Sequence, residues 1–394
     1  MPGMTGIKIY DLATGDARDS TGEDLATITR VADALPNIDA VCVSCKNVAR
    51  SDIYGEIEEF ATLIENASKP LEYLCENVES FITAIDLATA VRGSRQALEQ
   101  KPYFMQIVTP LPLTFWRTHV DQIIVGARRH SNERWHAADR WRLGAHHHGG
   151  CMVNSVATDF AAMVLGQLVR RGSFVIGSSD VRFMEPATGG MGNFPQTWLA
   201  DIAVHQIRRH IGIPSFTGIG GRSVARRFNQ DAVWEISASF MQAFFSRPAT
   251  LDYLGLIDNG ITYSLHALCL CDELAGLLRT MWQGMRVDAD TMALALAREI
   301  GPRGNYLAQM HTARHCRDQL WPARHLGTHI PLSMGLKPDR ELFSRIDDDL
   351  RRIVNEHRPA PLARGILAAL KDIQASFERS YQPRETGLQQ PCRS

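Results

Sequence analysis

Short apolar runs alternate with longer segments of helical periodicity along the first two-thirds of the chain. Each run is too short for a helix, so we expect buried β-strands at Asp39–Ser44, Leu71–Cys75, Phe104–Thr109, Phe174–Gly177, Ser215–Ile219 and Leu251–Ile257. Between the runs, apolar residues recur at i, i+3 and i+4, which predicts helices over Ile53–Ile64, Val78–Val91, Phe115–Ile124, Met152–Val169, Trp198–Ile211 and Val233–Phe245. A repeat of roughly 30 to 40 residues suits a parallel strand and its crossover helix. The pattern therefore predicts an α/β fold, either a doubly wound sheet or a (β/α) barrel.

After Tyr263 the apolar spacing becomes wholly helical. We expect helices over 265–282, 289–300 and 305–321, and a long helical stretch over 341–378 that breaks at the prolines of 359–363. These segments would form additional C-terminal helices. We therefore expect one domain over residues 1–380 and a polar tail over residues 381–394.

Composition and charge narrow the class of protein. The 394 residues are 45% hydrophobic and 22% charged, which excludes disordered and fibrous proteins. Lys and Arg total 42 against 43 Asp and Glu, with no basic block, so we expect neither nucleic acid nor a membrane as a partner. The start of the chain lacks the pattern of a signal peptide, and we expect a cytoplasmic protein with reduced cysteines.

Cysteine and histidine spacing raises two metal hypotheses. Cys42 and Cys45 form a CxxC, but they lie in an apolar run without a second CxxC, so we interpret them as buried structural residues. His311 and His315 are spaced i, i+4, as paired metal ligands on a helix would be. No third ligand is evident in the sequence, so structural or substrate-contact roles are favoured, and no tightly bound metal is expected.

A Gly-rich segment, FTGIGGR at 216–222, follows one predicted strand. It is either an anion-binding nest of backbone N–H groups or a loop that needs positive φ. In a barrel, chemistry gathers where strands end, so this loop and the Asp258–Gly260 segment are candidate site elements.

Five segments carry a resemblance to a known family: Asp16–Asp39, Arg208–Gly218, Gly255–Leu265, Cys271–Asp288 and Glu299–Pro322. They are similar to the trimethylamine methyltransferase family, including its pyrrolysine-free, glycine-betaine-type members. The resemblance covers nearly the whole chain. It implies a (β/α)8 TIM-type barrel and the transfer of a methyl group from a quaternary or tertiary methylated amine to the Co(I) of a corrinoid (cobalamin). That corrinoid is carried by a small partner protein.

The sequence contains no pyrrolysine, which favours a betaine-like quaternary amine as the substrate. In the chemistry that the resemblance implies, Co(I) is the nucleophile and the enzyme positions the ammonium, so no catalytic side chain is expected. Aromatic faces and polar groups suit such a substrate. The candidate lining consists of two aromatic and four polar side chains: Phe216, Tyr253, Asp258, Asn259, His266 and His311. Ordinary structural hydrogen bonding stays open for each of them.

The segment Arg128–Gly150 departs from the family. It shows neither a strand nor a helix period, whereas the family has a Gly- and Pro-rich strand and loop of the form GIPxxxG…GGxxxPxTxAG. Synonymous GC-rich codons for this segment can be chosen so that translation from the second base of each gives GGIPMSGGMLPIGGASAPITMAG. Trp135 and Trp141 have one codon each, and both yield Gly in that frame. We infer a compensated pair of frameshifts, in the gene or in its sequencing, and on this hypothesis the histidine tract His146–His148 is not a ligand set.

Two further departures concern the start and one loop. Family members carry additional sequence before a segment like Asp11–Arg18, so we expect a barrel that lacks its first elements. The family's GPGG loop is GPRG at Gly301–Gly304, with Arg303 in place of a Gly.

Two alternatives to the methyltransferase remain, besides the open question of whether a second copy of the chain is a partner. One is a non-catalytic or defective remnant of such an enzyme. The other is a metal-dependent barrel hydrolase that uses His146–His148 with His311 and His315.

Overall fold

The computed structural model describes residues 6–12, 14–50, 52–110, 113–129, 134–137, 147–179, 181, 183, 187, 195–217, 220–316, 320–326 and 341–381. The strands are β1 (Lys8–Tyr10), β2 (Ala17–Asp19), β3 (Val41–Cys42), β4 (Leu71–Leu74), β5 (Phe104–Val108), β6 (Arg134–Ala137), β7 (Phe174–Ser179), β8 (Ser215–Thr217), β9 (Thr250–Leu251), β10 (Leu256–Ile257) and β11 (Thr262–Tyr263). The helices are α1 (Gly22–Ala34), α2 (Ile53–Asn66), α3 (Val78–Arg92), α4 (Arg95–Gln100), α5 (Arg117–Arg129), α6 (His148–Val169), α7 (Pro195–His210), α8 (Gln230–Ser246), α9 (Leu265–Gln283), α10 (Ala289–Met292), α11 (Leu294–Ile300), α12 (Met310–His315), α13 (Leu342–Glu356) and α14 (Arg364–Ser380). Short 3-10 turns lie at Val48–Arg50 and Asp258–Gly260.

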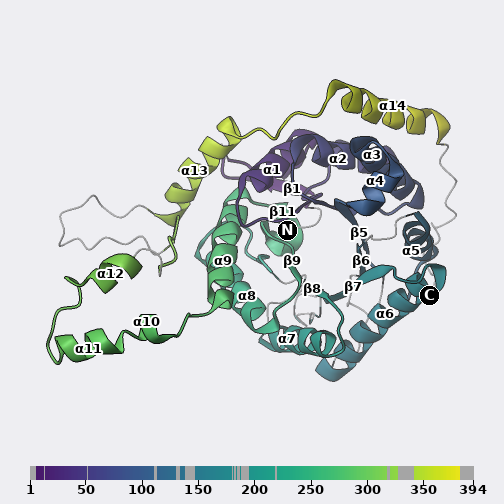
Figure 1. Cartoon of the computed structure of the whole chain (residues 1–394). Coiled ribbons are helices and arrows are strands. Elements are labelled where there is room, and N and C mark those ends of the chain that lie inside the picture. Colours follow the sequence, from purple (N-terminus) through teal and green to yellow (C-terminus); the bar gives the residue numbers. More distant parts are fainter. Residues whose placement is uncertain are drawn as a thin grey trace.

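Seven strands form one parallel sheet in the order of the sequence, from β3 to β9. Figure 1 shows these strands around a central axis, with the helices in an outer ring. A second sheet has the order β10-β11-β1-β2, in which Lys8 of β1 lies opposite Thr262 of β11. An isolated parallel bridge between Gly6 and Cys45 connects the start of the described chain to the segment after β3. The repeated parallel strand and helix units confirm the predicted α/β class.

The edge strands β3 and β9 of the seven-stranded sheet are not paired with each other in the described part of the chain. A cavity of about 570 Å³ lies at the amino-terminal ends of β3, β4, β5 and β9, and α8 and α9 contribute side chains to its wall. Because the two edges do not pair there, the described residues do not show a closed eight-stranded barrel.

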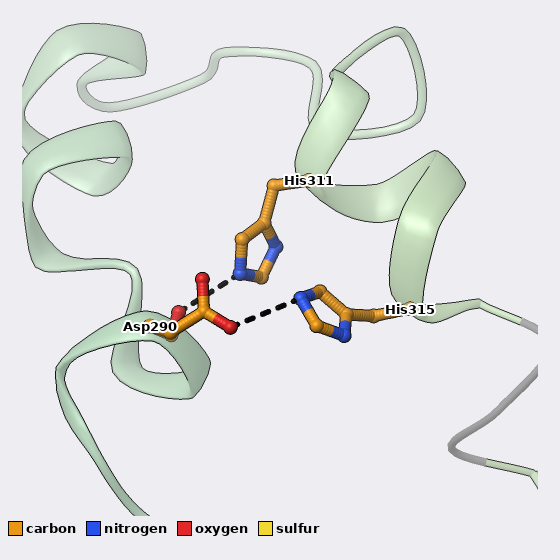
Figure 2. Close-up of side chains that lie close together, drawn as sticks. All are labelled: Asp290, His311 and His315. Atoms are coloured by element: carbon orange, nitrogen blue, oxygen red, sulfur yellow. Dashed lines mark hydrogen bonds and ion pairs between the residues drawn. The ribbon is translucent and has the colours of Figure 1, made fainter.

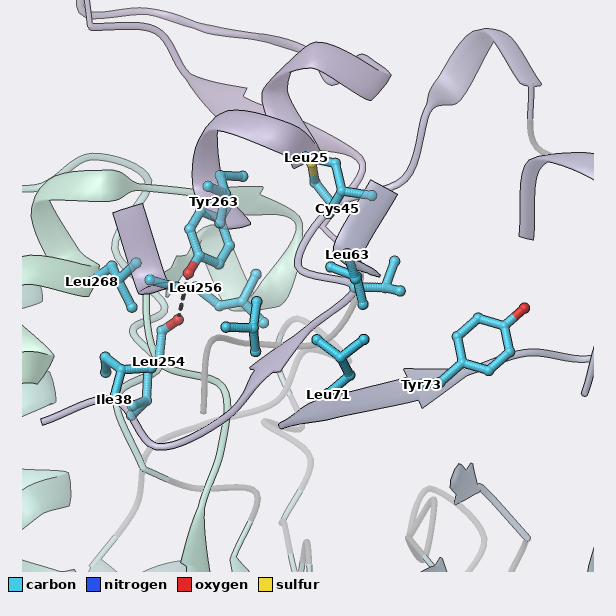
Figure 3. Close-up of a cluster of buried hydrophobic side chains, with 14 of the residues drawn as sticks. Leu25, Ile38, Cys45, Leu63, Leu71, Tyr73, Leu254, Leu256, Tyr263 and Leu268 are labelled. Atoms are coloured by element: carbon cyan, nitrogen blue, oxygen red, sulfur yellow. Dashed lines mark hydrogen bonds between the residues drawn. The ribbon is translucent and has the colours of Figure 1, made fainter. Parts of the chain in front are cut away.

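The main core joins the sheets to α9 through Tyr263 (Figure 3). The Tyr263 ring is fully buried, and its hydroxyl donates a hydrogen bond to the Leu254 carbonyl at 3.0 Å. Gly255 makes this contact possible, because a Cβ at Gly255 would lie 2.8 Å from the Tyr263 ring and its φ is +94°. A larger residue at 255 would therefore displace the ring.

A buried ion pair connects the neighbouring helices α6 and α7. Arg208 is fully buried, its Nε donates to Asp159 Oδ2 at 2.7 Å, and its Nη2 donates to Ser155 Oγ at 2.9 Å. Buried charges of this kind need a partner, because their desolvation is costly. By length and composition, Gly149–Val169 of α6 also qualifies as a membrane-spanning candidate, and 28% of its apolar window is buried. In the structure it packs against α5, α7 and β7.

The C-terminal helices divide into a packed pair and an arm. Helix α13 contacts α1 and α9, and α14 contacts α2 and α3, as the prediction of additional C-terminal helices requires. Helices α10, α11 and α12 contain no buried residue, and Figure 1 shows them projecting from the ring. We call residues 285–316 the arm. Several apolar side chains of the arm are exposed: Met285, Val287, Met292, Leu294, Leu307 and Met310.

Several predicted element boundaries are wrong. The single strand expected at Leu251–Ile257 is two strands, because Tyr253 (φ +61°) and Gly255 (φ +94°) have left-handed backbone that breaks the extended run. The helix expected over 289–300 breaks at Ala293 (φ +47°). Of the helix expected over 305–321, the described residues show only α12.

The sequence patterns also missed four strands, β1, β2, β6 and the two-residue β11. Strands β1 and β2 have only three residues each, and β6 lies inside the aperiodic segment Arg128–Gly150. Residues 130–133 and 138–146 of that segment lie outside the described residues, as do residues 382–394 of the predicted tail.

Candidate functional site

Three buried polar side chains meet on the inner face of the seven-stranded sheet. The Tyr73 hydroxyl of β4 donates to the Glu56 carbonyl on α2 at 3.0 Å, so Tyr73 points outward. Glu72 precedes Tyr73, and alternation along the strand turns its side chain to the opposite, inner face. Glu72 lies opposite Cys42 of β3 in the register, and Asp252 directly follows β9. The Cys42 sulfur and one carboxylate oxygen of each acid lie within 4.8 Å of one another.

Burial dominates the electrostatics of this cluster. Glu72 and Asp252 are fully buried, and Cys42 is 2% exposed. Burial, with the neighbouring Asp252 charge, raises the pKa of Glu72 well above its usual range. Burial also raises the pKa of the Cys42 thiol, and the charges of Asp252 and Glu72 add to the effect. A cation placed among these groups would favour the ionised form of the acids, so the cluster suits an organic cation or a metal ion chemically.

Aromatic side chains lie on the same inner face. Tyr253 packs against the small cluster of Cys42 and Ile107. The Ser215 and Thr217 hydroxyls flank Phe216 in β8 and contact α7, so Phe216 points inward, where it packs with Ile176. The structure therefore brings the two predicted aromatic residues, Tyr253 and Phe216, to the inner face.

Asp258 and Asn259 form a tight turn after β10. Both have left-handed backbone, with φ of +51° and +57°, and their amides donate to the carbonyls of Ala225 and Ser223. The Asn259 Oδ1 is buried and has no hydrogen-bond partner among the described residues. Arg222 flanks this turn, because its side chain lies 3.9 Å from the position of a Cβ on Gly260.

Arg222 connects that turn to the aromatic residue of the inner cluster. Its guanidinium carbon lies 5.6 Å from the centre of the Tyr253 ring, in a cation–π contact, and the residue is only 5% exposed. It follows Gly220 and Gly221, and a Cβ on Gly220 would lie 2.1 Å from Leu251. The FTGIGGR segment is thus packed tightly against β9. Residues 218 and 219 are outside the described part, so the nest hypothesis stays a prediction.

His266 lies on the outer layer of the fold. Its ring stacks on Phe343 at 4.2 Å between centroids and on Phe228 at 5.9 Å, and its Nε2 is 3.2 Å from Asp347 Oδ1. Burial lowers the pKa of this histidine. These contacts connect α9 to α13, so the structure gives His266 a packing role there and does not bring it to the Glu72–Asp252 cluster.

His311 lies on the arm, away from the inner face of the sheet (Figures 1 and 2). Its Nε2 is 2.9 Å from the carbonyl oxygen of Asp290 on α10. His315 Nε2 is 3.5 Å from Asp290 Oδ2. Asp290 is the third polar group that the sequence spacing of the two histidines did not reveal.

Among the described residues, His147 is not part of the cluster that His311 and His315 form. His147 is exposed and caps α6, where its Nδ1 accepts a hydrogen bond from the Gly149 amide at 3.3 Å. His146 and the side chain of His148 lie outside the described part.

Both cysteines of the CxxC are buried, as the structural interpretation expects, but Cys42 also belongs to the candidate cluster. Cys42 and Cys45 are both buried, and the seven cysteines of the described residues have free thiols. Cys42 faces the inner cluster with Ile107, whereas Cys45 belongs to the main core. The two sulfur atoms of the CxxC therefore lie in different environments.

Sequence reasoning missed Glu72, Asp252 and Arg222 as site residues. Glu72 and Asp252 each occupy the second position of a predicted apolar run, LEYLC and LDYLGLI. The candidate site residues, in contrast, were sought after the end of each run. A charged residue inside an apolar run was the available signal, because alternate strand positions face the interior.

Comparison with known proteins identifies the family of this chain. The family model described as trimethylamine methyltransferase matches residues 1–380. The chain is 25% identical to a trimethylamine methyltransferase of Desulfitobacterium hafniense, over 95% of this chain and 76% of that protein. It is 24% identical to a trimethylamine methyltransferase of Methanosarcina barkeri, over 95% and 76%. A glycine betaine methyltransferase of Desulfitobacterium hafniense is 25% identical over 82% of this chain and 68% of that protein. A family match over almost the entire chain confirms the resemblance, and the chain belongs to the trimethylamine methyltransferase family.

Proposed function

We propose that this chain moves a methyl group from a betaine-like quaternary amine to the Co(I) corrinoid of a partner protein. The observation that carries the proposal is the buried pair of carboxyl groups, Glu72 and Asp252, on the inner face of a sheet in a member of this family. We further propose that the seven parallel strands form the larger part of a (β/α)8 barrel.

The inner cluster suits a permanently charged ammonium. Such a group has no N–H to donate, so charge and aromatic faces are the main means of holding it. A carboxylate about 4 Å from the ammonium contributes an attraction of about 4 kcal/mol near a protein surface before desolvation is counted. Glu72 and Asp252 supply the charge, and Tyr253 supplies an aromatic face beside Cys42.

Arg222 is the group we propose for a carboxylate on the substrate. It is buried, it contacts the Tyr253 ring, and its planar guanidinium can bind a carboxylate with two parallel hydrogen bonds. A quaternary amine with a carboxylate would then have its two opposite charges met by the acids and by Arg222. This pairing supports a betaine as the substrate.

The cluster also fits an acceptor that comes from outside the chain. The raised pKa of Cys42 keeps its thiol neutral, and a neutral thiol is a poor nucleophile. The Co(I) corrinoid, when present on its partner protein, supplies the nucleophile that this cluster lacks. The residues of this chain would hold the ammonium in line with that acceptor, so that the methyl group passes from nitrogen to the acceptor as the C–N bond breaks and a neutral tertiary amine leaves.

The test is methyl transfer to cob(I)alamin by the purified full-length chain, followed by the visible absorbance of the cobalamin. Glycine betaine, other betaines and trimethylamine serve as donors. We expect transfer from a betaine, and we expect Glu72→Gln and Asp252→Asn to raise the KM for the amine about tenfold or more. Glu23→Gln, an exposed acid on α1, is the matched control and should leave KM unchanged.

A pH series separates binding by Glu72 from a merely structural effect. The ionised carboxylate attracts the ammonium, so the KM of the unmodified chain should fall as the pH rises, and Glu72→Gln should abolish this dependence. Folded protein that transfers no methyl group from any donor would refute the proposal and would favour the defective remnant. Equal KM values in all variants would refute the assignment of the site.

A further inference from the structure

The arm carries a polar cluster that connects two of its helices. Helices α10 and α12 are four and six residues long, and none of their residues is buried, so a hydrophobic core does not hold them. Their connection is a set of three side chains, Asp290 from α10 and His311 and His315 from α12 (Figure 2). Some twenty residues of chain separate the two ends of this connection.

The geometry of the three side chains is that of a metal-binding set. His311 and His315 are one helical turn apart, and their ring centres are 4.5 Å from each other. One ligand atom of each of the three residues lies within 4.8 Å of the other two. In a tetrahedral zinc site with bonds of about 2.1 Å, two ligand atoms lie about 3.4 Å apart. The 3.5 Å between His315 Nε2 and Asp290 Oδ2 matches that spacing.

A hydrogen bond to the backbone of Asp290 orients the His311 ring. Its Nε2 is 2.9 Å from the Asp290 carbonyl oxygen, and an N–H donated to a carbonyl is the usual second interaction of a metal-bound histidine. That bond leaves the other ring nitrogen with the lone pair that a metal needs. The backbone of Asp290 thus fixes one ligand while its carboxylate supplies another.

We propose that Asp290, His311 and His315 bind one divalent transition metal ion, with water completing its coordination. Two imidazoles and one carboxylate suit zinc better than magnesium or calcium, which prefer oxygen ligands. The ion ties α10 to α12 and orders the arm. This structural site is separate from the Glu72–Asp252 cluster, and methyl transfer does not require its chemistry.

An ion-pair cluster without metal is the competing explanation. Arg286 lies 3.6 Å from Asp290 Oδ2 through its Nη2, and its Nε donates to Asp288. Its positive charge competes with a metal for the Asp290 carboxylate. The two explanations therefore predict opposite effects of removing Arg286.

The first experiment titrates the metal-free full-length chain with Co²⁺ and then displaces it with Zn²⁺, using the visible absorption of tetrahedral Co²⁺. We expect His311→Ala, His315→Ala and Asp290→Asn each to weaken the binding of one equivalent at least tenfold. His210→Ala, an exposed histidine on α7, should leave it unchanged. Cys316→Ser, next to the site, should also leave it unchanged, which separates this set from binding by a surface thiol. Unweakened binding in the three ligand variants would overturn the proposal.

The second experiment measures order in the arm by hydrogen exchange, with and without Zn²⁺. Zinc should slow exchange in peptides that contain α10 and α12, and His315→Ala should abolish the slowing. Arg286→Gln should tighten metal binding, because it removes the competing charge. If zinc changes nothing in the arm while Arg286→Gln speeds its exchange, the ion-pair explanation holds and the metal site is refuted.

Discussion

Glu59 is a buried carboxylic acid on α2 whose ionisation opposes folding. It is 3% exposed, and its Oε1 accepts a hydrogen bond from the Asn47 amide at a long 3.4 Å. Its Oε2 has no hydrogen-bond partner among the described residues. Burial raises the pKa of Glu59 from 4.5 to about 7, despite the attraction of Lys46.

The raised pKa of Glu59 makes the free energy of unfolding depend on pH. Between pH 4.5 and about 7 the folded chain keeps a proton on Glu59 that the unfolded chain has released, so the free energy of unfolding falls as the pH rises through this window. At 1.36 kcal/mol for each pH unit, the cost is about 3 kcal/mol once the pH exceeds 7. Glu59→Gln keeps the size of the side chain and removes the charge. The variant should therefore gain up to about 3 kcal/mol over the unmodified protein at alkaline pH.

Urea unfolding at about pH 5 and about pH 8 measures this gain. The difference between the variant and the unmodified protein cancels every other titrating group, and it should grow by about 2 to 3 kcal/mol between the two pH values. Glu58→Gln is the matched control, because Glu58 is the adjacent residue, is 40% exposed and pairs with Arg50. It should cost at most about 1 kcal/mol and show no growing gain. A gain for Glu59→Gln that is the same at both pH values would refute the reasoning.

Three further substitutions test other features. Arg208→Met leaves Asp159 buried without its cation and should lower the free energy of unfolding, measured in urea, by about 3 to 5 kcal/mol. The double variant with Asp159→Leu should recover much of this loss, and additive losses would contradict the pairing. Tyr263→Phe removes the hydrogen bond to the Leu254 carbonyl and should cost about 1 kcal/mol by thermal unfolding, and a cost near zero would argue against that bond. Arg303 has a φ of +69°, so Arg303→Gly should relieve about 1 kcal/mol of backbone strain. Hydrogen exchange in the arm should then be about fivefold slower, and faster exchange would contradict the strain.

Sequence periodicity predicted where buried strands lie better than it predicted where the extended backbone breaks within an apolar run. The runs at β4 and β5 begin at the predicted residues, because each is a continuous apolar segment between turn residues. Between β9 and β10 the residues other than Asp252 continue one apolar run, although the backbone turns at Tyr253 with positive φ. That turn depends on a tertiary contact, the approach of the Tyr263 ring to Gly255, and local spacing does not report such a contact. The resemblance did foresee one such position, since Arg303 occupies a left-handed site where the family has Gly.

The candidate site residues lie in different parts of the fold for a physical reason. The aromatic residues Tyr253 and Phe216 lie on the inner face of the sheet. The histidines do not, because His266 lies on a face of α9 that packs against α13, and His311 lies on the arm. A helix distributes its side chains around a full turn, so the direction of a helical histidine depends on tertiary packing. Strand positions have only two directions, and this makes Glu72 recoverable from the sequence in retrospect.

The pairing of β1 with β11 has a consequence for the order in which the protein can assemble during synthesis. Each strand from β3 to β9 finds its partner in the unit made just before it, so these units can dock one after another as they emerge. Strand β1 precedes all of these strands in the chain, yet its parallel partner β11 lies roughly 250 residues later. At ribosomal rates of 5 to 20 residues per second, the two strands are translated about 12 to 50 s apart. For that interval the edge of β1 that faces β11 is unpaired, so β1 is translated before the parallel strands and yet completes its pairing after them.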